Sequence, residues 1–413
     1  MVKSIFWLGT IQVINYSLPF LLLPILLNRV GVVNYGNISL AMGLVMIVTS
    51  LVDFGFNLTG SRDISLVKTT AEERSIIRDI VSARMTLILI GAILFTGIVL
   101  SIEPFSENTK LMLYSFPLII TNSLFPSWYF IGKQHTKPLF LLTFLSRIIY
   151  FLLIIFFVND THDSVYVNML NALGWFASLL ICPYFLPSGL FKFSNLNFSK
   201  VWQTILNNKL ISLSSLLVSS QRSLPIVIAG TILSPSDLGI YSIADKTILA
   251  ITSMFIILHS SFFPKYCLYL QENSKISTLI QLIRPVVTPI TAVIGIGSAL
   301  FFFFGSDGLA LLSADLKTDQ FKTITPLIAF IPLGLLINLP ISMTLVAANL
   351  KKAYLRYNTV GLLVLVPLCF LLGSLFKIQG IILAMLITEF LIFIAGIYLI
   401  RCNMINNELL VHD

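Results

Sequence analysis

Charge is scarce in this chain of 413 residues, and the scarcity excludes most classes of soluble protein. Only 11% of the residues are charged, whereas 57% are hydrophobic. A water-soluble domain of this size needs a more polar surface. The four cysteines show no paired spacing, which argues against a disulfide framework or a metal site. Because a nucleotide-binding glycine loop and a nucleophile beside a base are also lacking, the sequence predicts no enzyme and no cofactor.

Hydrophobic runs fill the chain instead. A helix needs about 20 mostly apolar residues to cross ~30 Å of hydrocarbon. The sequence therefore predicts an all-α polytopic membrane protein with about 12 transmembrane helices, at residues 4–28, 37–58, 80–101, 110–132, 138–158, 165–187, 208–232, 240–265, 280–304, 322–348, 352–375 and 378–402. The first run lacks a small-residue cleavage site, which favours a retained span over a signal peptide.

The loops between these spans differ in their content of lysine and arginine. Eighteen basic residues fall on the face that holds both termini, and five fall on the opposite face. Cytoplasmic loops hold basic residues in excess, so we predict that both termini are cytoplasmic. The net charge of +8 is then a signal of topology, and no contiguous basic face indicates nucleic-acid binding.

A weak internal repeat relates the two halves of the chain. An offset of 203 residues aligns Gly36 with Gly239, together with Ser39/Ser242, Ala41/Ala244, Thr49/Thr252 and Ser50/Ser253. With six spans in each half, the repeats are parallel. We predict two pseudo-symmetric six-helix bundles, 1–190 and 208–413, joined by a cytoplasmic linker at 191–207. A central cleft between such bundles suits a carrier that works by alternating access.

The longest predicted cytoplasmic connection runs from Thr59 to Asp79. Thr69 and Glu72 have the spacing of a capping box and precede apolar residues at helical intervals. The pattern predicts a short amphipathic helix at the inner membrane surface, with Arg74 facing lipid headgroups, although a plain solvated helix is an equal alternative.

Six ionisable residues are predicted to fall well inside the spans: Asp53, Arg147, Arg222, Asp245, Lys246 and Glu389. Each costs about 2.5–3.5 kcal/mol at mid-membrane on insertion scales, so each needs a partner or a wet cavity. The functional interpretation is a lumen that binds a polar or anionic substrate.

The candidate lumen residues are Arg222, Arg147, Lys246 and Asn15, and the candidates for ion coupling or gating are Glu389, Asp53, Asp245 and His259. The structural alternative is ion pairing between helices, for instance Arg147 with Glu389. Asp53 could likewise pair with an arginine of the following loop, and His259 could make an ordinary structural hydrogen bond.

Two segments resemble the O-antigen flippases of the Wzx type, in the polysaccharide-transport branch of the multidrug/oligosaccharidyl-lipid/polysaccharide exporter superfamily. One joins Val33-Asn34-Tyr35-Gly36 to Leu51-Val52-Asp53-Phe54-Gly55-Phe56-Asn57-Leu58 and Gly60-Ser61-Arg62-Asp63. The other is Leu124-Phe125-Pro126-Ser127-Trp128-Tyr129-Phe130-Ile131-Gly132. The family often has Gln where this chain has Ile131.

The resemblance implies a function in lipopolysaccharide biosynthesis. Such proteins move oligosaccharide repeat units, linked to undecaprenyl pyrophosphate, from the cytoplasmic to the periplasmic leaflet of the bacterial inner membrane. A polysaccharide polymerase and a chain-length regulator are implied as partners besides membrane lipids. Arg222 and Arg147 would then bind the pyrophosphate, because guanidinium groups suit bidentate phosphate contacts.

A multidrug exporter of the same superfamily is the alternative, and it would depend on Asp53 and Glu389. A membrane-embedded polymerase or ligase is disfavoured, since such enzymes generally need a large outer loop.

Overall fold

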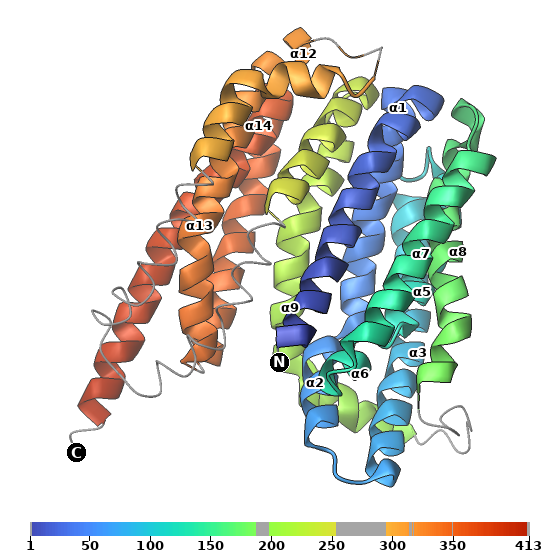
Figure 1. Cartoon of the computed structure of the whole chain (residues 1–413). Coiled ribbons are helices and arrows are strands. Elements are labelled where there is room, and N and C mark those ends of the chain that lie inside the picture. Colours follow the sequence, from blue (N-terminus) through green and yellow to red (C-terminus); the bar gives the residue numbers. More distant parts are fainter. Residues whose placement is uncertain are drawn as a thin grey trace. The chain divides into compact units, whose positions relative to one another are not determined.

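The computed structural model describes residues 2–186, 198–252, 295–313, 316, 318–348 and 350–410, and every regular element in these ranges is a helix (Figure 1). The chain divides into two compact units, unit 1 (Met1–Thr231) and unit 2 (Ile232–Asp413), which we treat separately.

Unit 1 contains α1 (Val2–Asp53), α2 (Phe56–Leu66), α3 (Thr70–Ser101), α4 (Thr109–Ser115), α5 (Pro117–Leu124), α6 (Ser127–Gly132), α7 (Thr136–Phe157), η1 (Thr161–Tyr166), α8 (Val167–Ile181), η2 (Cys182–Phe185) and α9 (Phe198–Ile232, whose last residue opens unit 2). Unit 2 contains helices at 235–252 and 295–310, α12 (Thr318–Lys322), α13 (Thr325–Ala347) and α14 (Lys351–Leu410).

Among the described residues, six helical segments are long and apolar enough to cross a membrane. Two of them, Gly9–Leu66 with 58 residues and Lys351–Cys402 with 52, are more than twice the length of one crossing. Each contains a sharp bend, at Gly31 (φ 80°) in α1 and at Lys377 (φ 51°) in α14. Each therefore supplies two spans. The predicted all-α multi-pass membrane fold is confirmed, while parts of the predicted spans 240–265 and 280–304 lie outside the described residues.

The two segments that carried the family resemblance pack against each other in unit 1. α1 ends where Phe54 (φ 47°) and Gly55 (φ 73°) adopt left-handed conformations, and α2 then lies beside α6. A Cβ at Gly132 would lie 2.6 Å from the Ser61 carbonyl oxygen, and a Cβ at Gly60 would lie 2.9 Å from the Trp128 ring. The glycines of the motifs thus permit a helix contact that larger residues would block.

Proline shapes the matched spans of the two units differently. Pro117 starts α5 and Pro126 is the N-cap of α6, so the predicted span 110–132 consists of three short helices. A separate offset of 215 residues aligns Pro117 with Pro332, and each is followed within ten residues by a second proline, Pro126 and Pro340. Pro332 and Pro340 lie inside the continuous α13. An interior proline removes one backbone donor, and membrane helices tolerate this loss where neighbouring groups satisfy the freed carbonyl.

The repeat offset of 203 also relates the turns of the chain. It maps the bend at Gly31 onto Ser234, in the connection between α9 and the helix that starts at residue 235. α9 nevertheless packs on the second half of α1: Gly43 faces Ile226 and Gly230 faces Leu40. The contacts therefore group α9 with unit 1, whereas the sequence placed residues 208–232 in the C-terminal bundle. The division of the repeats at 191–207 stays a prediction.

The predicted surface helix after Thr59 is wrong in its position. The separate short helix is α2, which ends at Leu66. Thr69 accepts a hydrogen bond from the Glu72 N–H and caps α3, which continues without a break through Asp79 into the span. Since nothing between Thr70 and Ser101 interrupts helical geometry, Arg74 belongs to the first turns of a long helix.

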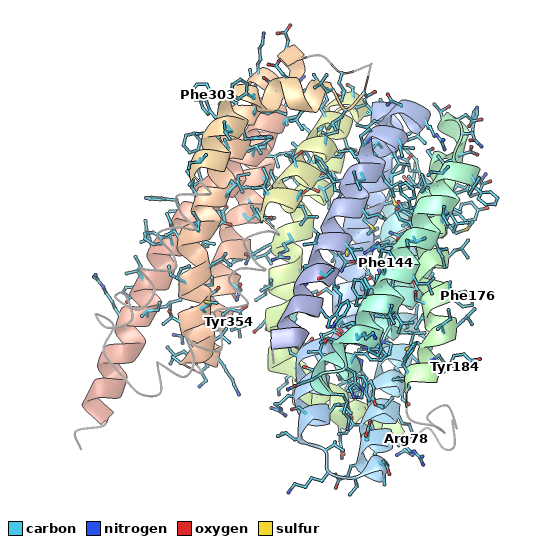
Figure 2. The ribbon with its side chains drawn as sticks, viewed as in Figure 1. Arg78, Phe144, Phe176, Tyr184, Phe303 and Tyr354 are labelled. Carbon is cyan, nitrogen blue, oxygen red and sulfur yellow. The ribbon has the colours of Figure 1, made fainter. Side chains whose placement is uncertain are left out.

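Large apolar side chains cover the outside of unit 1. Phe176 on α8 is 50% exposed and Tyr184 on η2 is 88% exposed, and Figure 2 shows both on the outer side of these elements. Such side chains suit contact with lipid, and tyrosine near a helix end suits the membrane–water interface. In unit 2, α13 and α14 pack through Ile341, Leu345, Ala353, Tyr357 and Ile392.

Candidate functional site

Arg147 lies in the middle of a predicted span of unit 1. It precedes the end of α7 at Phe157 by ten residues, or about 15 Å of helix. Its Nε donates to Asn15 Oδ1 at 3.0 Å, and its Nη1 donates to Asn171 Oδ1 at 3.4 Å. The guanidinium carbon lies 5.2 Å from the centre of the Trp175 ring. The structure thus brings together two residues predicted to line a lumen, Arg147 and Asn15, and adds two residues of α8.

Close packing of α7 and α8 holds this cluster. A Cβ at Gly174 would lie 2.4 Å from the Ser146 carbonyl oxygen, so only glycine lets α8 approach α7 beside Arg147. One turn further on, Ser178 Oγ donates to the Leu142 carbonyl at 2.7 Å. Asn171 and Trp175 flank Gly174 and therefore reach the guanidinium. The sequence analysis missed Trp175 as a partner because a lone tryptophan in a span resembles lipid-facing apolar residues.

The charge of Arg147 is not neutralised within its unit. No acidic residue of the described part of unit 1 forms an ion pair with it. Its three remaining N–H groups, one on Nη1 and two on Nη2, also lack a partner in that part of the chain. A half-buried cation held only by neutral acceptors and an aromatic face can bind an anion.

Arg84 and Asp53 form a second polar centre at the end of unit 1 that carries α2. Arg84 is 2% exposed, and its Nη2 donates to both Asp53 and Asn57, the latter at 3.1 Å. Its Nη1 donates to the Ser123 carbonyl at 2.7 Å. The sequence offered, as the structural alternative, that Asp53 pairs with an arginine of the following loop, and the count of basic loop residues took in Arg84 although it falls in the predicted span 80–101. The pairing with an arginine is confirmed, but Arg84 lies on the buried face of α3 and not in a loop.

The spacing of apolar residues along α3 could have predicted that Arg84 is buried. Ile77, Ile80, Leu87 and Ile88 are all buried, and Arg84 occurs at a helical interval from them. A neighbouring group lies on the same side of the unit: Tyr129 donates to Glu73 at 2.7 Å, and Lys133 pairs with Glu73 at 2.9 Å. These contacts join α3 to α6 and leave both carboxylates, Asp53 and Glu73, with basic partners.

Glu389 has no such basic partner among the described residues of unit 2. Asn338 Nδ2 donates to its Oε2 at 2.5 Å and to its backbone carbonyl at 2.8 Å. Tyr357 donates in turn to Asn338 Oδ1 at 3.2 Å. No cation of the described part of unit 2 forms an ion pair with Glu389. The carboxylate is therefore held by a neutral amide, an arrangement that mirrors the one around Arg147.

The other predicted site residues behave differently. Lys246 pairs with its neighbour Asp245 at 3.3 Å, so the two charges largely cancel. Arg222 is exposed and has no partner among the described residues of unit 1. It precedes the end of α9 at Ile232 by ten residues, the same interval as for Arg147 in α7. His259 lies outside the described residues. The roles of these residues stay predictions.

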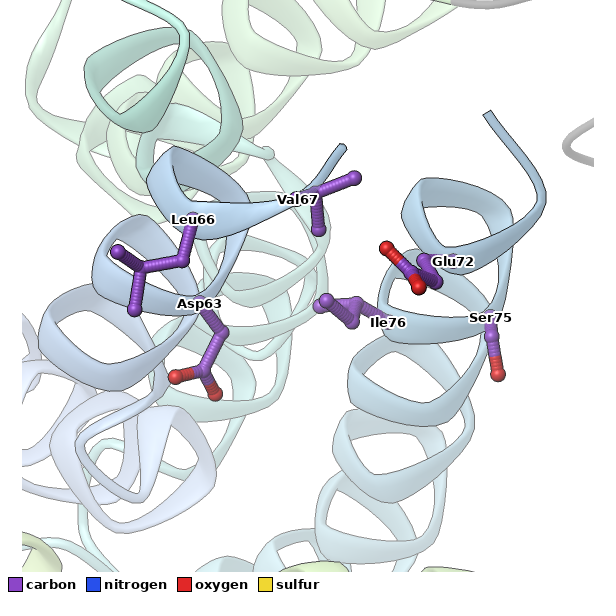
Figure 3. Close-up of a pocket in the computed structure, with 6 residues that line it drawn as sticks. All are labelled: Asp63, Leu66, Val67, Glu72, Ser75 and Ile76. Carbon is purple, nitrogen blue, oxygen red and sulfur yellow. The ribbon is translucent and has the colours of Figure 1, made fainter. Parts of the chain in front are cut away.

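A surface pocket opens between α2 and the first turns of α3 (Figure 3). It is lined by Asp63, Leu66, Val67, Glu72, Ser75 and Ile76. None of the residues predicted to bind substrate lines this pocket. Asp63 is occupied by Arg62 at 2.8 Å, so the pocket is a feature of the α2–α3 corner rather than of the spans.

Comparison with known proteins agrees with the motifs. A family model described as "Polysaccharide biosynthesis protein" matches residues 1–266. A protein of Escherichia coli (strain K12) named "Putative O-antigen transporter" is 24% identical over 415 residues, which cover 99% of this chain and 98% of that protein. A protein of Shigella dysenteriae with the same name is 23% identical over 184 residues, or 45% of this chain and 46% of that protein.

Solved structures give the fold. An inward-facing multidrug resistance transporter of the MATE family, in the MOP superfamily, has a TM-score of 0.63 at 14% identity and covers 96% of this chain and 98% of its own. An outward-facing transporter of the same family has a TM-score of 0.56 at 16% identity and covers 97% of this chain and 95% of its own. At these identities the likeness concerns the fold alone. The chain belongs to the polysaccharide biosynthesis protein family, as the motifs predicted, and it has the helical fold of these MOP-superfamily transporters.

Proposed function

We propose that this protein is a flippase of the bacterial inner membrane. It would move oligosaccharide repeat units of O-antigen, linked to undecaprenyl pyrophosphate, from the cytoplasmic to the periplasmic leaflet. Family membership and the transporter fold support a membrane carrier over an enzyme, and the names of the two relatives support an O-antigen substrate. Both termini would lie in the cytoplasm, and a polysaccharide polymerase with a chain-length regulator would receive the product.

The observation that carries the proposal is the uncompensated charge of Arg147. A pyrophosphate cannot cross ~30 Å of hydrocarbon unaided, so a carrier must offer it a polar, cationic path. Three N–H groups of Arg147 have no partner in the described part of unit 1, and Arg147 lies about 15 Å from the end of its helix, close to the centre of a bilayer. We assign it to the phosphate headgroup.

Arg222 is the second candidate for the headgroup. In the predicted topology α7 and α9 cross the membrane in the same direction, so equal intervals from the helix ends give the two arginines a similar depth. Arg222 is exposed and has no partner among the described residues of unit 1, which suits a role that begins only when substrate is present. Lys246 is a weaker candidate, because Asp245 already neutralises it.

Glu389 is our candidate for ion coupling. A carboxylate held by the neutral amide of Asn338 can bind a proton or Na⁺ without first breaking an ion pair with any described residue of unit 2. Asp53 is less suited to this role, since Arg84 would have to release it. His259 and Asp245 remain secondary candidates for gating. Alternating access would then follow from exchange of the ion against the substrate, as in other carriers with repeated bundles.

Complementation tests the proposal. The chain is expressed in a bacterium that lacks its own flippase but makes the matching repeat unit, and long surface polysaccharide is scored. We expect the unaltered chain to restore it, Arg147→Ala to abolish it, and Arg147→Lys to restore it in part. Arg62→Ala is the matched control, since it removes an exposed arginine outside the spans. Full activity of Arg147→Ala at equal membrane expression would contradict the assignment of the headgroup site.

A multidrug exporter is the alternative, because multidrug resistance transporters of the MATE family share the fold of this chain. Such a carrier would depend on Glu389, the carboxylate without a cation partner in the described part of unit 2. Drug efflux that Glu389→Gln abolishes and Arg147→Ala leaves intact would favour the exporter.

A further inference from the structure

We infer that Asn15 and Asn171 determine the charge selectivity of the Arg147 site, because they orient the guanidinium without neutralising it. The inference rests on the proposed function and adds to it the residues that make the site select an anion. Both asparagines would be positioning residues, and they act on the substrate through Arg147.

Some contacts of Arg147 orient its guanidinium, and other parts of the guanidinium are available to bind an anion. Asn15 comes from α1 and Asn171 from α8, so Arg147 on α7 is fixed from two sides. Trp175 covers one face of the guanidinium at 5.2 Å, and Phe125 packs against the Trp175 ring at 4.9 Å between centroids. These contacts use two of the five N–H groups and one face, and the three other N–H groups, which have no partner in the described part of unit 1, are available to a ligand.

The choice of asparagine is the decisive chemical point. An aspartate at either position would accept the same hydrogen bond with nearly the same shape, and it would bind the guanidinium more strongly. It would also cancel the positive charge on which an anionic ligand depends. The same chain uses a carboxylate where an arginine is only structural, in the pair of Asp53 with Arg84. Amide partners at Arg147 therefore preserve a charge that a carboxylate would remove.

An aspartate in place of either asparagine should have opposite effects on the thermal stability of the protein and on its binding of pyrophosphate. Asn171→Asp should keep or raise the melting temperature of the purified protein, because it creates an ion pair with Arg147. It should weaken binding of inorganic pyrophosphate by about tenfold or more, because the added carboxylate repels the ligand. A merely structural role of Asn171 predicts that Asp, which makes the better hydrogen bond, is tolerated in both measurements. Asn15→Asp should behave in the same way.

The experiment uses the full chain in lipid nanodiscs of one fixed composition for all variants. Binding of inorganic pyrophosphate and of a short-chain prenyl pyrophosphate is titrated at constant ionic strength, and the melting temperature is measured on the same samples. Asn122→Asp is a control for adding a carboxylate elsewhere in a span, and Asn171→Leu reports the loss of the contact without added charge. Transport is scored in parallel by complementation.

Each outcome is decisive. Loss of binding and transport in Asn171→Asp and Asn15→Asp, with the melting temperature kept, supports the inference. Unchanged binding in both aspartate variants, while Arg147→Ala loses it, overturns the inference and leaves the proposed function standing. If the unaltered chain binds neither pyrophosphate and Arg147→Ala still transports, the proposed headgroup site fails and the inference fails with it. If both aspartate variants unfold, Asn15 and Asn171 are structural and the inference is overturned.

Discussion

Gly132 on α6 lies directly against the backbone of Ser61 on α2, so close that a Cβ at Gly132 would be 2.6 Å from the Ser61 carbonyl oxygen. Backbone cannot move aside as the end of a flexible side chain can. The two segments by which the chain resembles its family meet at this point. Gly60 and Gly132 are therefore explained by packing, while the charged candidates for substrate binding lie elsewhere.

Gly132→Ala should consequently destabilise unit 1. Overpacking of this kind costs about 1–3 kcal/mol. We expect a lower melting temperature in detergent and a smaller folded fraction in the membrane. Gly97→Ala is the matched control, since no atom lies within 4 Å of a Cβ at that position of α3. There the change should be neutral or stabilising by up to about 1 kcal/mol, because alanine favours helix over glycine. Equal effects at both positions would refute the packing argument.

Removing one partner of the buried pair of Arg84 and Asp53 should destabilise unit 1 more than replacing both residues with apolar ones. Arg84→Ala leaves Asp53 as an uncompensated carboxylate and should destabilise unit 1 by about 3–5 kcal/mol. The double variant Arg84→Met/Asp53→Leu removes both charges and should recover most of that loss. Thermal unfolding of Arg84→Met, Asp53→Leu and the double variant gives the coupling energy. Additive effects would mean that the two side chains do not depend on each other.

Lys377 should be replaceable by glycine with a gain in stability. Its backbone has φ 51° and ψ −129° at the bend of α14, a conformation that residues with a Cβ rarely adopt. Such residues store about 1–3 kcal/mol of strain. Lys377→Gly should recover part of it, although the contact of Lys377 with Asp237 at 3.7 Å is lost. That contact is exposed on the lysine side and contributes ~1 kcal/mol or less.

Lys377→Ala separates the two effects. It removes the same contact with Asp237 but keeps the strained backbone, so it should be less stable than both the glycine variant and the unaltered chain. A glycine variant that melts below the alanine variant would contradict the assignment of strain.

Glu389→Gln should uncouple transport from an imposed ion gradient. Glutamine keeps a side-chain oxygen that can accept from Asn338, so the variant should fold and insert normally. It cannot bind a proton or Na⁺ as a carboxylate does. In proteoliposomes with a set pH or Na⁺ gradient, we expect substrate movement by the unaltered chain to follow the gradient and movement by the variant to ignore it.

The control for this measurement is Glu107→Gln, which changes an exposed carboxylate in the connection between α3 and α4. Its transport should follow the gradient as that of the unaltered chain does. Gradient dependence that survives in Glu389→Gln would exclude this residue as the coupling group and turn attention to Asp245.

The position of most described spans followed from the sequence, because hydropathy measures a property of each residue and its near neighbours. The bends at Gly31 and Lys377 divide the long helices where the sequence placed the connections between spans. The prediction failed at residues 56–81, where the short helix lies before Thr69 and not after it. A capping box there marked a helix start correctly but did not say how far the helix runs.

The sequence by itself determined the class of this protein and its family, since apolar length and local motifs need no knowledge of contacts, and it listed most of the charges inside the spans while it missed the buried Arg84. The tertiary structure alone decided which of those charges are compensated. Arg84 meets Asp53 across 31 positions of the chain, and Arg147 meets Asn15 across 132. No local pattern reports such partners, because a charge is neutralised by what packs beside it in space. For that reason Arg84, which the sequence counted with the loop residues, is a structural cation paired with Asp53. Arg147 has no acidic partner in the described part of unit 1, so its charge can act on a ligand.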